Sequence, residues 1–426
     1  MSKIILGCVA DDFSGASDAA SFFVKEGIKT FLFNGIPKED IKDLSEDIVV
    51  VIALKTRTQE TSKAVSDTLE AFDWLKKNGA KQLFIKYCST FDSTKKGNIG
   101  PIIDSVLEKY NIKYTILCPA LPVNGRTVVN GKLYINDVPL NETHMKDHPL
   151  TPMWDSDLSK LMEPQGRYPC LKIDYEMLEQ SNEEILKVVE DFGKNNNHFY
   201  VIPDYIEEKH AKKIASLFGN LPLLTGGSGL MTELGSKYRN ITTSEFENIT
   251  SHTTGKAIIL AGSCSKATLE QIEDFKSSNG EYLKINPMAL MDGSQTKEEI
   301  GEAIRLTSED AILVYSSDNP ENVRTAQKFG SQLVSDLLEQ TTAYIAKVAV
   351  ENGFNRIIVA GGETSGAVTK ILGYDSYLVG DSIAPGVPVM IPINNKNIRL
   401  VLKSGNFGQK DFFMRAINTT KENENG

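Results

Sequence analysis

Short apolar runs alternate with longer amphipathic stretches along most of this 426-residue chain. The apolar runs are rich in Val and Ile, as expected for strands that are buried on both faces of a parallel sheet. In the first half, the strand-like runs are residues 4–10, 30–33, 48–54, 82–86, 114–119 and 199–202. Helical patterns between them include residues 16–26, 60–77 and 183–192. The alternation predicts an α/β fold with mainly parallel sheets.

Turn-forming and polar segments divide this pattern. Two Asn-Gly pairs, Asn124-Gly125 and Asn130-Gly131, bracket a short alternating segment, which predicts a hairpin insertion with type I′ turns. The polar residues 240–254 predict a linker. Beyond it we expect strands at 257–261, 282–285, 311–315 and 356–360, a long helix at 321–351, and a strand-rich segment from Tyr377 to about Phe412. The sequence therefore predicts two α/β domains, residues 1–239 and 255–426, with the active site in the cleft between them.

Composition narrows the class of ligand and the location. The chain has 46 Lys and Arg against 56 Asp and Glu, a formal net charge of −10, which disfavours nucleic acid but permits a small anion held by a few cations. Five cysteines are scattered singly, without the spacing of a metal-thiolate site, so we predict no such site and assign no residue as a metal ligand from this pattern. We find no signal-peptide pattern and no apolar run long enough to span a membrane, and we expect a cytoplasmic protein without membrane partners.

Two adjacent carboxylates, Asp11 and Asp12, follow the first strand-like run in the segment ADDFSGASD. The carboxyl ends of parallel strands are where α/β folds bind ligands, so this position favours a functional site. The alternative is helix capping, because Asp and Ser are good caps. A cap accounts for one Asp but not for the pair.

Further polar residues follow the strand-like runs 48–54 and 82–86. Lys55 and Arg57 alternate onto one face at the end of one strand, and Arg57 could bind a carboxylate through two hydrogen bonds. Lys86, Ser89 and Asp92 lie in and after the strand 82–86, in a loop rich in hydroxyl groups that suits a polyol or sugar acid. A solvated basic strand end and an ordinary Ser/Thr turn are the alternatives.

Two other loops, residues 122–127 and 148–153, carry the candidate substrate-binding residues Arg126 and His148, and each loop contains proline, which restricts the backbone. A structural role for His148 is equally compatible with the sequence.

Three small-residue turns characterise the second half. Gly262-Ser263-Cys264-Ser265 and Gly361-Gly362-Glu363-Thr364 each follow a strand and open a helix, and Lys403-Ser404-Gly405 is the third. Free amides and the helix dipole at such turns favour phosphate. The sequence has no GxxxxGK[ST] motif and no GxGxxG after the first strand, so the nucleotide site it predicts is neither a P-loop nor a dinucleotide fingerprint.

These motifs together resemble the four-carbon acid sugar kinases, most closely the 3-oxo-tetronate 4-kinase branch. The resemblance extends along nearly the whole chain and includes ADDFSGASD, ALKTRT, KYCSTFDSTKKGNIGP, PALPVNGRT, HPLTPM, LTGGSG, AGSCS, AGGETSG, APGVP and KSGNFG. It implies an N-terminal domain for the sugar acid and a C-terminal domain for ATP. The nucleotide contacts that it implies are Ser263, Gly361, Gly362, Glu363, Thr364 and Gly405. Ser14 departs from the Thr frequent in the family, but it keeps the hydroxyl.

The resemblance also implies the reaction, transfer of the γ-phosphoryl group of ATP with Mg²⁺ to the 4-hydroxyl of 3-oxo-tetronate. We expect Asp12 to orient the hydroxyl and take its proton, with Asp11 as the second choice or a metal partner. Arg57, together with Lys86, would hold the substrate carboxylate. A threonate or erythronate kinase and a non-catalytic sugar-acid sensor are the alternatives. The resemblance is compatible with a homodimer.

Overall fold

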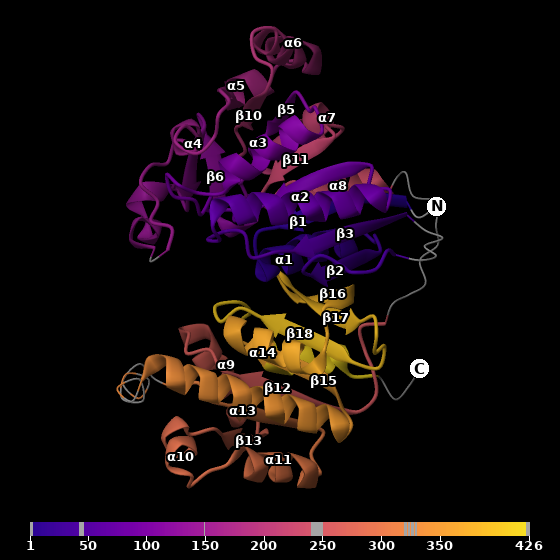
Figure 1. Cartoon of the computed structure of the whole chain (residues 1–426), viewed down its shortest axis with the longest axis vertical. Coiled ribbons are helices and arrows are strands. Elements are labelled where there is room, and N and C mark those ends of the chain that lie inside the picture. Colours follow the sequence, from indigo (N-terminus) through magenta and orange to yellow (C-terminus); the bar gives the residue numbers. More distant parts are fainter. Residues whose placement is uncertain are drawn as a thin grey trace. The chain divides into compact units, whose positions relative to one another are not determined.

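The computed structural model describes residues 3–41, 47–148, 150–239, 250–318, 322, 324, 328 and 330–422 (Figure 1). The chain divides into two compact units, Met1–Phe246 and Glu247–Gly426. The predicted linker, residues 240–254, spans this division, and residues 240–249 lie outside the described part. The predicted domain limits of 1–239 and 255–426 stay predictions.

Unit 1 is built from βα units with one inserted hairpin. Its elements are β1 (Lys3–Ala10), α1 (Phe13–Lys25), β2 (Thr30–Asn34), β3 (Asp47–Ala53), α2 (Thr61–Lys77), β4 (Gln82–Lys86), α3 (Ile99–Lys109), β5 (Tyr114–Ile116), η1 (Pro122–Asn124), β6 (Arg126–Val129), β7 (Lys132–Ile135), β8 (Val138–Pro139), η2 (Leu140–Glu142), η3 (His144–Asp147), α4 (Leu158–Met162), β9 (Cys170–Ile173), α5 (Tyr175–Leu178), α6 (Asn182–Gly193), β10 (Phe199–Pro203), α7 (Glu208–Phe218), β11 (Leu223–Gly226) and α8 (Met231–Arg239).

The main sheet of unit 1 has the parallel strand order β11-β4-β1-β3-β2. Strands β1 and β3 are almost entirely buried, which explains their continuous apolar sequences. Helix α1 packs against β1, β2 and β3 and also contacts α8, whereas α2 and α3 contact each other. Two smaller sheets, β5-β10-β9 and β6-β7-β8, complete the unit.

The inserted hairpin is confirmed, but only one of the two Asn-Gly pairs forms its turn: Asn124 ends the 3₁₀ helix η1, and Gly125 alone of that pair has a positive φ, of 74°. Strands β6 and β7 pair antiparallel, and Asn130 and Gly131 between them have φ values of 51° and 72°, as a type I′ turn requires. The buried carboxylate of Asp204 accepts the backbone N–H groups of Asn130 at 2.7 Å and Gly131 at 2.9 Å. The turn is therefore anchored to the end of β10.

Unit 2 is a second α/β unit. Its elements are β12 (Lys256–Ala261), α9 (Lys266–Ser277), β13 (Glu281–Lys284), α10 (Pro287–Asp292), α11 (Lys297–Leu306), β14 (Ala311–Tyr315), α13 (Ser331–Glu351), β15 (Phe354–Ala360), α14 (Gly362–Leu372), β16 (Ser376–Ala384), β17 (Val387–Pro392), β18 (Arg399–Lys403) and α15 (Phe412–Thr420).

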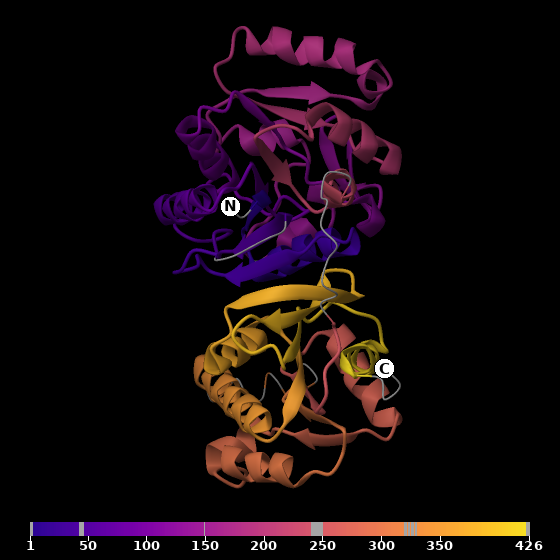
Figure 2. The ribbon, with the colours of Figure 1, turned by 90° about the vertical axis from the view of Figure 1, so that its right-hand side faces the viewer.

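Within unit 2 the strand order is β16-β17-β18-β15-β12-β14-β13, and only the pairings of β17 with β16 and β18 are antiparallel. Helices α13 and α14 pack together on one face of this sheet, and α9 and α15 pack together on the other (Figure 2). Ile259, Leu313 and Ile358 belong to the core cluster between sheet and helices. The expected α/β fold with mainly parallel sheets is confirmed.

Two predicted elements differ from those observed. The strand expected at 114–119 ends at Ile116, because the chain then changes partner: Leu117 N donates to Val201 O of β10, and Cys118 N donates to Thr225 O of β11. Helix α13 begins at Ser331 rather than at residue 321, after Gly330 with a φ of 115°. Most of residues 319–329 lie outside the described part. Among the described residues, no helix is both long and apolar enough to cross a membrane.

Candidate functional site

Four parallel strands of unit 1 end at the same level. Ala10 of β1 pairs with Ala53 of β3 and with Lys86 of β4, and Lys86 pairs with Gly226 of β11. The residues that follow these strand ends therefore meet at one edge of the sheet. This edge is where open α/β sheets bind ligands.

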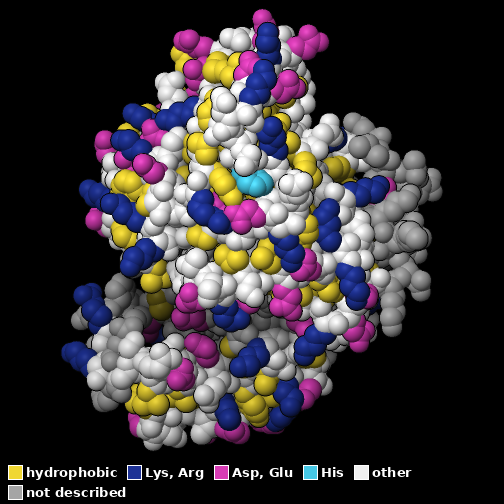
Figure 3. Space-filling view, turned by 45° about the horizontal axis from the view of Figure 1, so that its top comes forward, with side chains coloured by type: hydrophobic (Ala, Val, Ile, Leu, Met, Phe, Trp, Pro, Cys, Tyr) yellow, Lys and Arg dark blue, Asp and Glu magenta, His cyan; other side chains and the backbone are white. Residues whose placement is uncertain are grey.

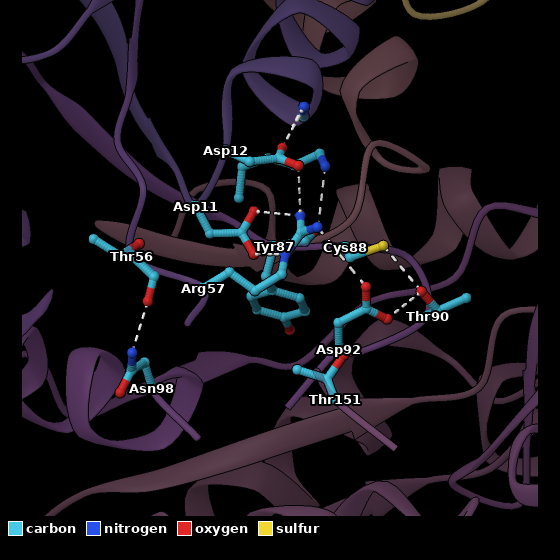
Figure 4. A network of polar contacts seen from close by, with 12 residues as sticks. Asp11, Asp12, Thr56, Arg57, Tyr87, Cys88, Thr90, Asp92, Asn98 and Thr151 are labelled. Atoms are coloured by element: carbon cyan, nitrogen blue, oxygen red, sulfur yellow. Dashed lines mark hydrogen bonds and ion pairs between the residues drawn. The ribbon is translucent and has the colours of Figure 1, made fainter. Parts of the chain in front are cut away.

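Arg57 lies at the centre of a charged cluster at this edge (Figure 4). Its Nε donates to Asp11 Oδ2 at 2.8 Å and its Nη2 to Asp11 Oδ1 at 3.0 Å, a bidentate pair. Nη2 also lies 3.0 Å from Asp12 Oδ2, and Nη1 lies 3.8 Å from Asp92 Oδ2. We call Asp11, Asp12, Arg57 and Asp92 the Arg57 cluster. One guanidinium group thus faces three carboxylates of the protein.

The two adjacent aspartates are not equivalent. Both carboxylate oxygens of Asp11 accept hydrogen bonds from Arg57, and its side chain is 13% exposed. Asp12 is the N-cap of α1, where its Oδ1 accepts the N–H of Gly15 at 2.6 Å. The side chain of Asp12 is nevertheless 35% exposed, so a ligand can reach this carboxylate. Asp12 therefore caps α1 and is still accessible to a ligand, whereas both carboxylate oxygens of Asp11 are bound by Arg57.

Burial and charge shift the pKa values within the cluster. Burial alone would lower the pKa of Arg57, but the carboxylates of Asp11 and Asp12 outweigh it and hold that pKa above its usual range. Burial raises the pKa of Asp11, and the charge of Arg57 opposes this shift. The ionised state of Asp11 therefore depends on Arg57.

The loop after β4 supports the cluster. Thr90 Oγ1 donates to Asp92 Oδ1 at 2.6 Å and lies 2.9 Å from Cys88 Sγ. Burial raises the pKa of the Cys88 thiol to about 11, so it stays protonated at neutral pH. Asn98 ties the neighbouring loop in place by donating to the carbonyl oxygens of Thr56 and Gln59 at 2.7 and 2.8 Å.

Lys86 differs from Arg57 in having no carboxylate partner among the described residues. It is 4% exposed, and its Nζ donates to Tyr87 O at 3.1 Å. It lines a cavity of about 20 Å³ together with Asp11, Arg57 and Asp92, which is room for about one water molecule. Burial raises the pKa of nearby Asp11 and the charge of Lys86 opposes that rise, but within the described part of the chain the Lys86 ammonium keeps unused donors for a further acceptor.

The other predicted substrate-binding residues lie apart from these contacts. Ser89 is half-buried in the loop after β4. Arg126 begins β6 and donates through Nη1 to Asn124 O, and His148 Nδ1 accepts the N–H of Thr151 at 3.0 Å. Over the described residues, neither Arg126 nor His148 forms a hydrogen bond or ion pair with the Arg57 cluster. Lys55 is exposed and is not part of the cluster.

Five parallel strands of unit 2 also end at one level. Ala261 of β12 pairs with Tyr315 and Ala360, Ala360 pairs with Lys403, and Tyr315 pairs with Lys284. The three predicted glycine turns, residues 262–265, 361–364 and 404–408, follow three of these ends and so come together.

The glycine turns pack more closely than side chains would allow. A Cβ atom at Gly405 would lie 2.2 Å from Ser263 Oγ, and one at Gly262 would lie 2.2 Å from Thr364 Oγ1. Gly361 has a φ of 133°, which favours glycine, and it caps α14 without a side-chain hydrogen bond. Gly362 begins this helix, so the unpaired amides of its first turn are available to an anion.

A cavity of about 620 Å³ adjoins these turns, a volume within the range of small-molecule sites. Gly262, Cys264 and Glu363 line it at the turns, and Pro287, Met288, Val334 and Leu338 add apolar surface. The exposed thiol of Cys264 borders the cavity.

Sequence reasoning missed several polar residues of this cavity. Lys284, Asn286, Ser316 and Asp318 also line it, and Lys284 Nζ lies 2.7 Å from Asp318 Oδ2. They lie at or just after the ends of β13 and β14. The strand-end argument that identified the glycine turns would have found them too.

The Arg57 cluster predicts a pH-dependent loss of stability in Arg57→Gln. The variant leaves Asp11 buried without its cation, which should cost about 2–4 kcal/mol of unfolding free energy at pH 7. Unopposed burial then raises the pKa of Asp11 further, so protonation relieves the penalty as the pH falls. Urea unfolding at pH 7 and at about pH 5 measures the difference.

Lys63→Gln is the control for this prediction. It breaks an exposed pair in which Lys63 Nζ lies 3.0 Å from Asp67 Oδ1, and it should cost under about 0.5 kcal/mol at both pH values. An Arg57→Gln penalty that does not change with pH would contradict the dependence of Asp11 on Arg57.

Comparisons with known proteins cover both units. A family model for a sugar-binding N-terminal domain matches residues 6–234, and one for a nucleotide-binding C-terminal domain matches residues 258–413. A 3-oxo-tetronate kinase of Brucella melitensis is 39% identical and aligns over 96% of this chain and 94% of its own length. A 3-oxo-tetronate kinase of Pectobacterium atrosepticum is 38% identical, over 97% of this chain and 98% of its own.

Two solved structures are similar to nearly the whole chain. A Haemophilus influenzae protein is 36% identical with a TM-score of 0.85, over 97% of this chain and 99% of its own. A Salmonella typhimurium LT2 protein, described provisionally as a tRNA synthase, is 35% identical with a TM-score of 0.88, over 96% and 98%. These matches, together with both family models, confirm the resemblance noted in the motifs: the chain belongs to the four-carbon acid sugar kinase family.

Proposed function

We propose that this kinase transfers the γ-phosphoryl group of ATP to the 4-hydroxyl of 3-oxo-tetronate, which gives 3-oxo-tetronate 4-phosphate and ADP. The names of the curated relatives support the acceptor. One structural observation carries the proposal: the sugar-binding unit holds an accessible carboxylate, Asp12, at its strand edge. The nucleotide-binding unit holds a nucleotide-sized cavity beside glycine turns at its own edge.

Asp12 is the group we assign to the acceptor hydroxyl. In the reaction the bond between O4 and the γ-phosphorus forms while the bond from that phosphorus to the bridging oxygen of ADP breaks. The transition state is loose, so the hydroxyl proton leaves late and a weak base suffices. Asp12 orients the hydroxyl and accepts this proton. Asp11 cannot accept the proton without losing its ion pair with Arg57. It instead holds the guanidinium group of Arg57 in place.

Lys86 suits the substrate carboxylate better than Arg57 does. The charge of Arg57 is already opposed by Asp11, Asp12 and Asp92, whereas the ammonium of Lys86 meets one carbonyl oxygen. The cavity that Lys86 lines holds about one water molecule, so it is too small for the sugar acid. The sugar acid would therefore lie at the exposed side of this cavity, beside Asp12. In this arrangement Arg57 positions the aspartates, and Ser89, Asp92, Arg126 and His148 stay predictions as substrate contacts.

On the nucleotide side we propose that Ser263, Gly361, Gly362, Glu363, Thr364 and Gly405 surround the phosphates. The free amides at the start of α14 and the contacts between the three turns support this assignment. The base and ribose would occupy the adjoining cavity, between the apolar side chains of Met288 and Leu338 and the polar strand ends.

We further propose that Mg²⁺ enters with ATP. Mg²⁺ takes oxygen ligands and is usually held by one or two carboxylates plus substrate phosphates. Glu363 brings a carboxylate to the cavity, and among the described residues no group of three His, Cys, Asp or Glu side chains could hold a metal alone. When bound, the ion neutralises charge on the β- and γ-phosphate oxygens.

The description of the Salmonella relative raises the alternative of a nucleic-acid substrate. The net charge of −10 disfavours it. On the face drawn in Figure 3, acidic and basic side chains are interspersed, and the coloured part of that face has no continuous basic area. We propose a cytoplasmic enzyme, consistent with its five free cysteines. A homodimer stays a prediction.

An ATP-consumption assay over a panel of four-carbon sugar acids tests the function. We expect the highest kcat/KM with 3-oxo-tetronate and phosphate on O4 of the product. A higher value with threonate or erythronate would instead identify the acceptor as a reduced acid. Turnover with no member of the panel would favour a sensor.

Asp12→Asn tests the role of Asp12 without removing the helix cap, because Asn caps helices as well as Asp does. Loss of the proton acceptor should lower kcat by roughly 10²–10⁴-fold. The affinity for ATP, measured by calorimetry, should stay unchanged. A kcat within threefold of the wild type would exclude Asp12 as the base.

Lys86→Met tests carboxylate recognition. A lost charge-assisted hydrogen bond should raise KM for the sugar acid roughly tenfold or more, with KM for ATP unaffected. A four-carbon ketose that lacks the carboxylate should be used equally poorly by the variant and the wild type. Lys55→Met, an exposed lysine at the same sheet edge, is the matched control. Equal losses with both acceptors would contradict carboxylate binding by Lys86.

A further inference from the structure

Lys403 is a buried cation at the end of β18. Its side chain is 1% exposed. Of the residues that the structure describes, none with a carboxylate lies within ion-pair distance of its Nζ. A buried ammonium lowers the stability of the fold unless neighbouring groups stabilise it.

The partners of Lys403 are all neutral and belong to the glycine turn 404–408 and to helix α9. Its Nζ donates to Gly405 O at 2.8 Å and to Thr268 Oγ1 at 3.0 Å, and it lies 3.4 Å from Ser404 O. Gly405 O also accepts from Ser265 Oγ at 2.7 Å and from Thr268 Oγ1 at 3.0 Å. Three donors from two segments therefore converge on one carbonyl oxygen.

This convergence fixes the direction of a peptide group. In a trans peptide, the carbonyl oxygen and the following N–H point in opposite directions, and no described peptide bond is cis. Since Gly405 O points at Lys403, the N–H of the exposed residue Asn406 points away from it. The same turn touches Ser263, because a Cβ at Gly405 would collide with Ser263 Oγ.

We propose that Lys403 is a positioning residue of the nucleotide site. Together with Ser265 and Thr268 it holds the Gly405 carbonyl inward, so that the turn 404–408 directs its free amides, and the field of the ammonium, at the phosphates of ATP. The inference rests on the proposed binding of ATP by unit 2 and names a residue that keeps its phosphate site in shape.

The charge of Lys403 should make the proton uptake on ATP binding depend on pH. Burial lowers the pKa of Lys403 to about 8. The groups that face its Nζ are Thr268 of α9, the ring of Phe412 of α15 at 5.7 Å, and the backbone of its own turn, and none of these titrates. Phosphates nearby favour the charged form and raise this pKa. ATP binding should therefore take up a proton above about pH 8 and almost none near pH 7.

Calorimetric titration with ATP in the absence of acceptor tests the proposal. Titrations at about pH 8.5, in two buffers of different ionisation enthalpy, measure the proton uptake. All variants carry Cys264→Ser, because that thiol lines the same cavity. Lys403→Met should weaken ATP binding roughly tenfold or more and abolish the uptake. Lys256→Met is the matched control, because the Lys256 ammonium donates to Thr307 O at the opposite end of β12. This variant should change neither the ATP affinity nor the proton uptake.

The possible failures are distinct. If the protein with Lys403 intact binds no ATP, the proposed function itself is wrong. If Lys403→Met binds ATP within twofold of its parent, or takes up the same number of protons, the role of Lys403 is wrong although the function stands. Should Lys403→Met not fold, Thr268→Val removes the bridging hydroxyl at constant shape. It should weaken ATP binding while keeping the uptake, and unchanged binding in this variant would overturn the proposal.

Discussion

Parallel strands that end in register are the constraint on which both sites depend. Ala10, Ala53 and Lys86 share one level in unit 1, and Ala261, Ala360 and Lys403 share one level in unit 2. Residues separated by tens or hundreds of positions in the sequence are thereby brought within hydrogen-bonding distance. A slip of one residue in any of these strands would turn its side chains to the opposite face of the sheet and separate the groups that the sites require.

The cations at these sheet edges have two different kinds of hydrogen-bond partner. Arg57 is surrounded by carboxylates, so its charge is used inside the protein to hold Asp11 and Asp12. Among the described residues, Lys86 and Lys403 are buried and donate to carbonyl and hydroxyl oxygens rather than forming ion pairs, although the charge of Lys86 also acts on nearby Asp11. A low-dielectric environment strengthens the attraction of such cations for an anion. An acidic protein can bind two anionic substrates in this way without a basic surface.

Much of the fold and part of the site follow from local sequence. The alternating pattern identified most strands, and the Asn130-Gly131 turn identified the hairpin, because both signals depend on nearby residues. The strand-end argument brought Asp11, Arg57 and Lys86 to one edge. It could not distinguish their roles, because pairing between residues 11 and 57 is a tertiary contact. The isolation of Lys403 from carboxylates was equally hidden, since it depends on what α9 and α15 place around the strand end.

The distribution of the five cysteines has a practical consequence. Cys8 and Cys118 are buried, and burial raises the pKa of the Cys88 and Cys170 thiols to about 11 and about 12. Cys264 alone among the five is exposed, and it borders the cavity beside the glycine turns of unit 2. Near pH 8, a maleimide dye should attach at this one position. The native chain thus carries its own attachment point for an optical reporter of cavity occupancy, with no engineered cysteine.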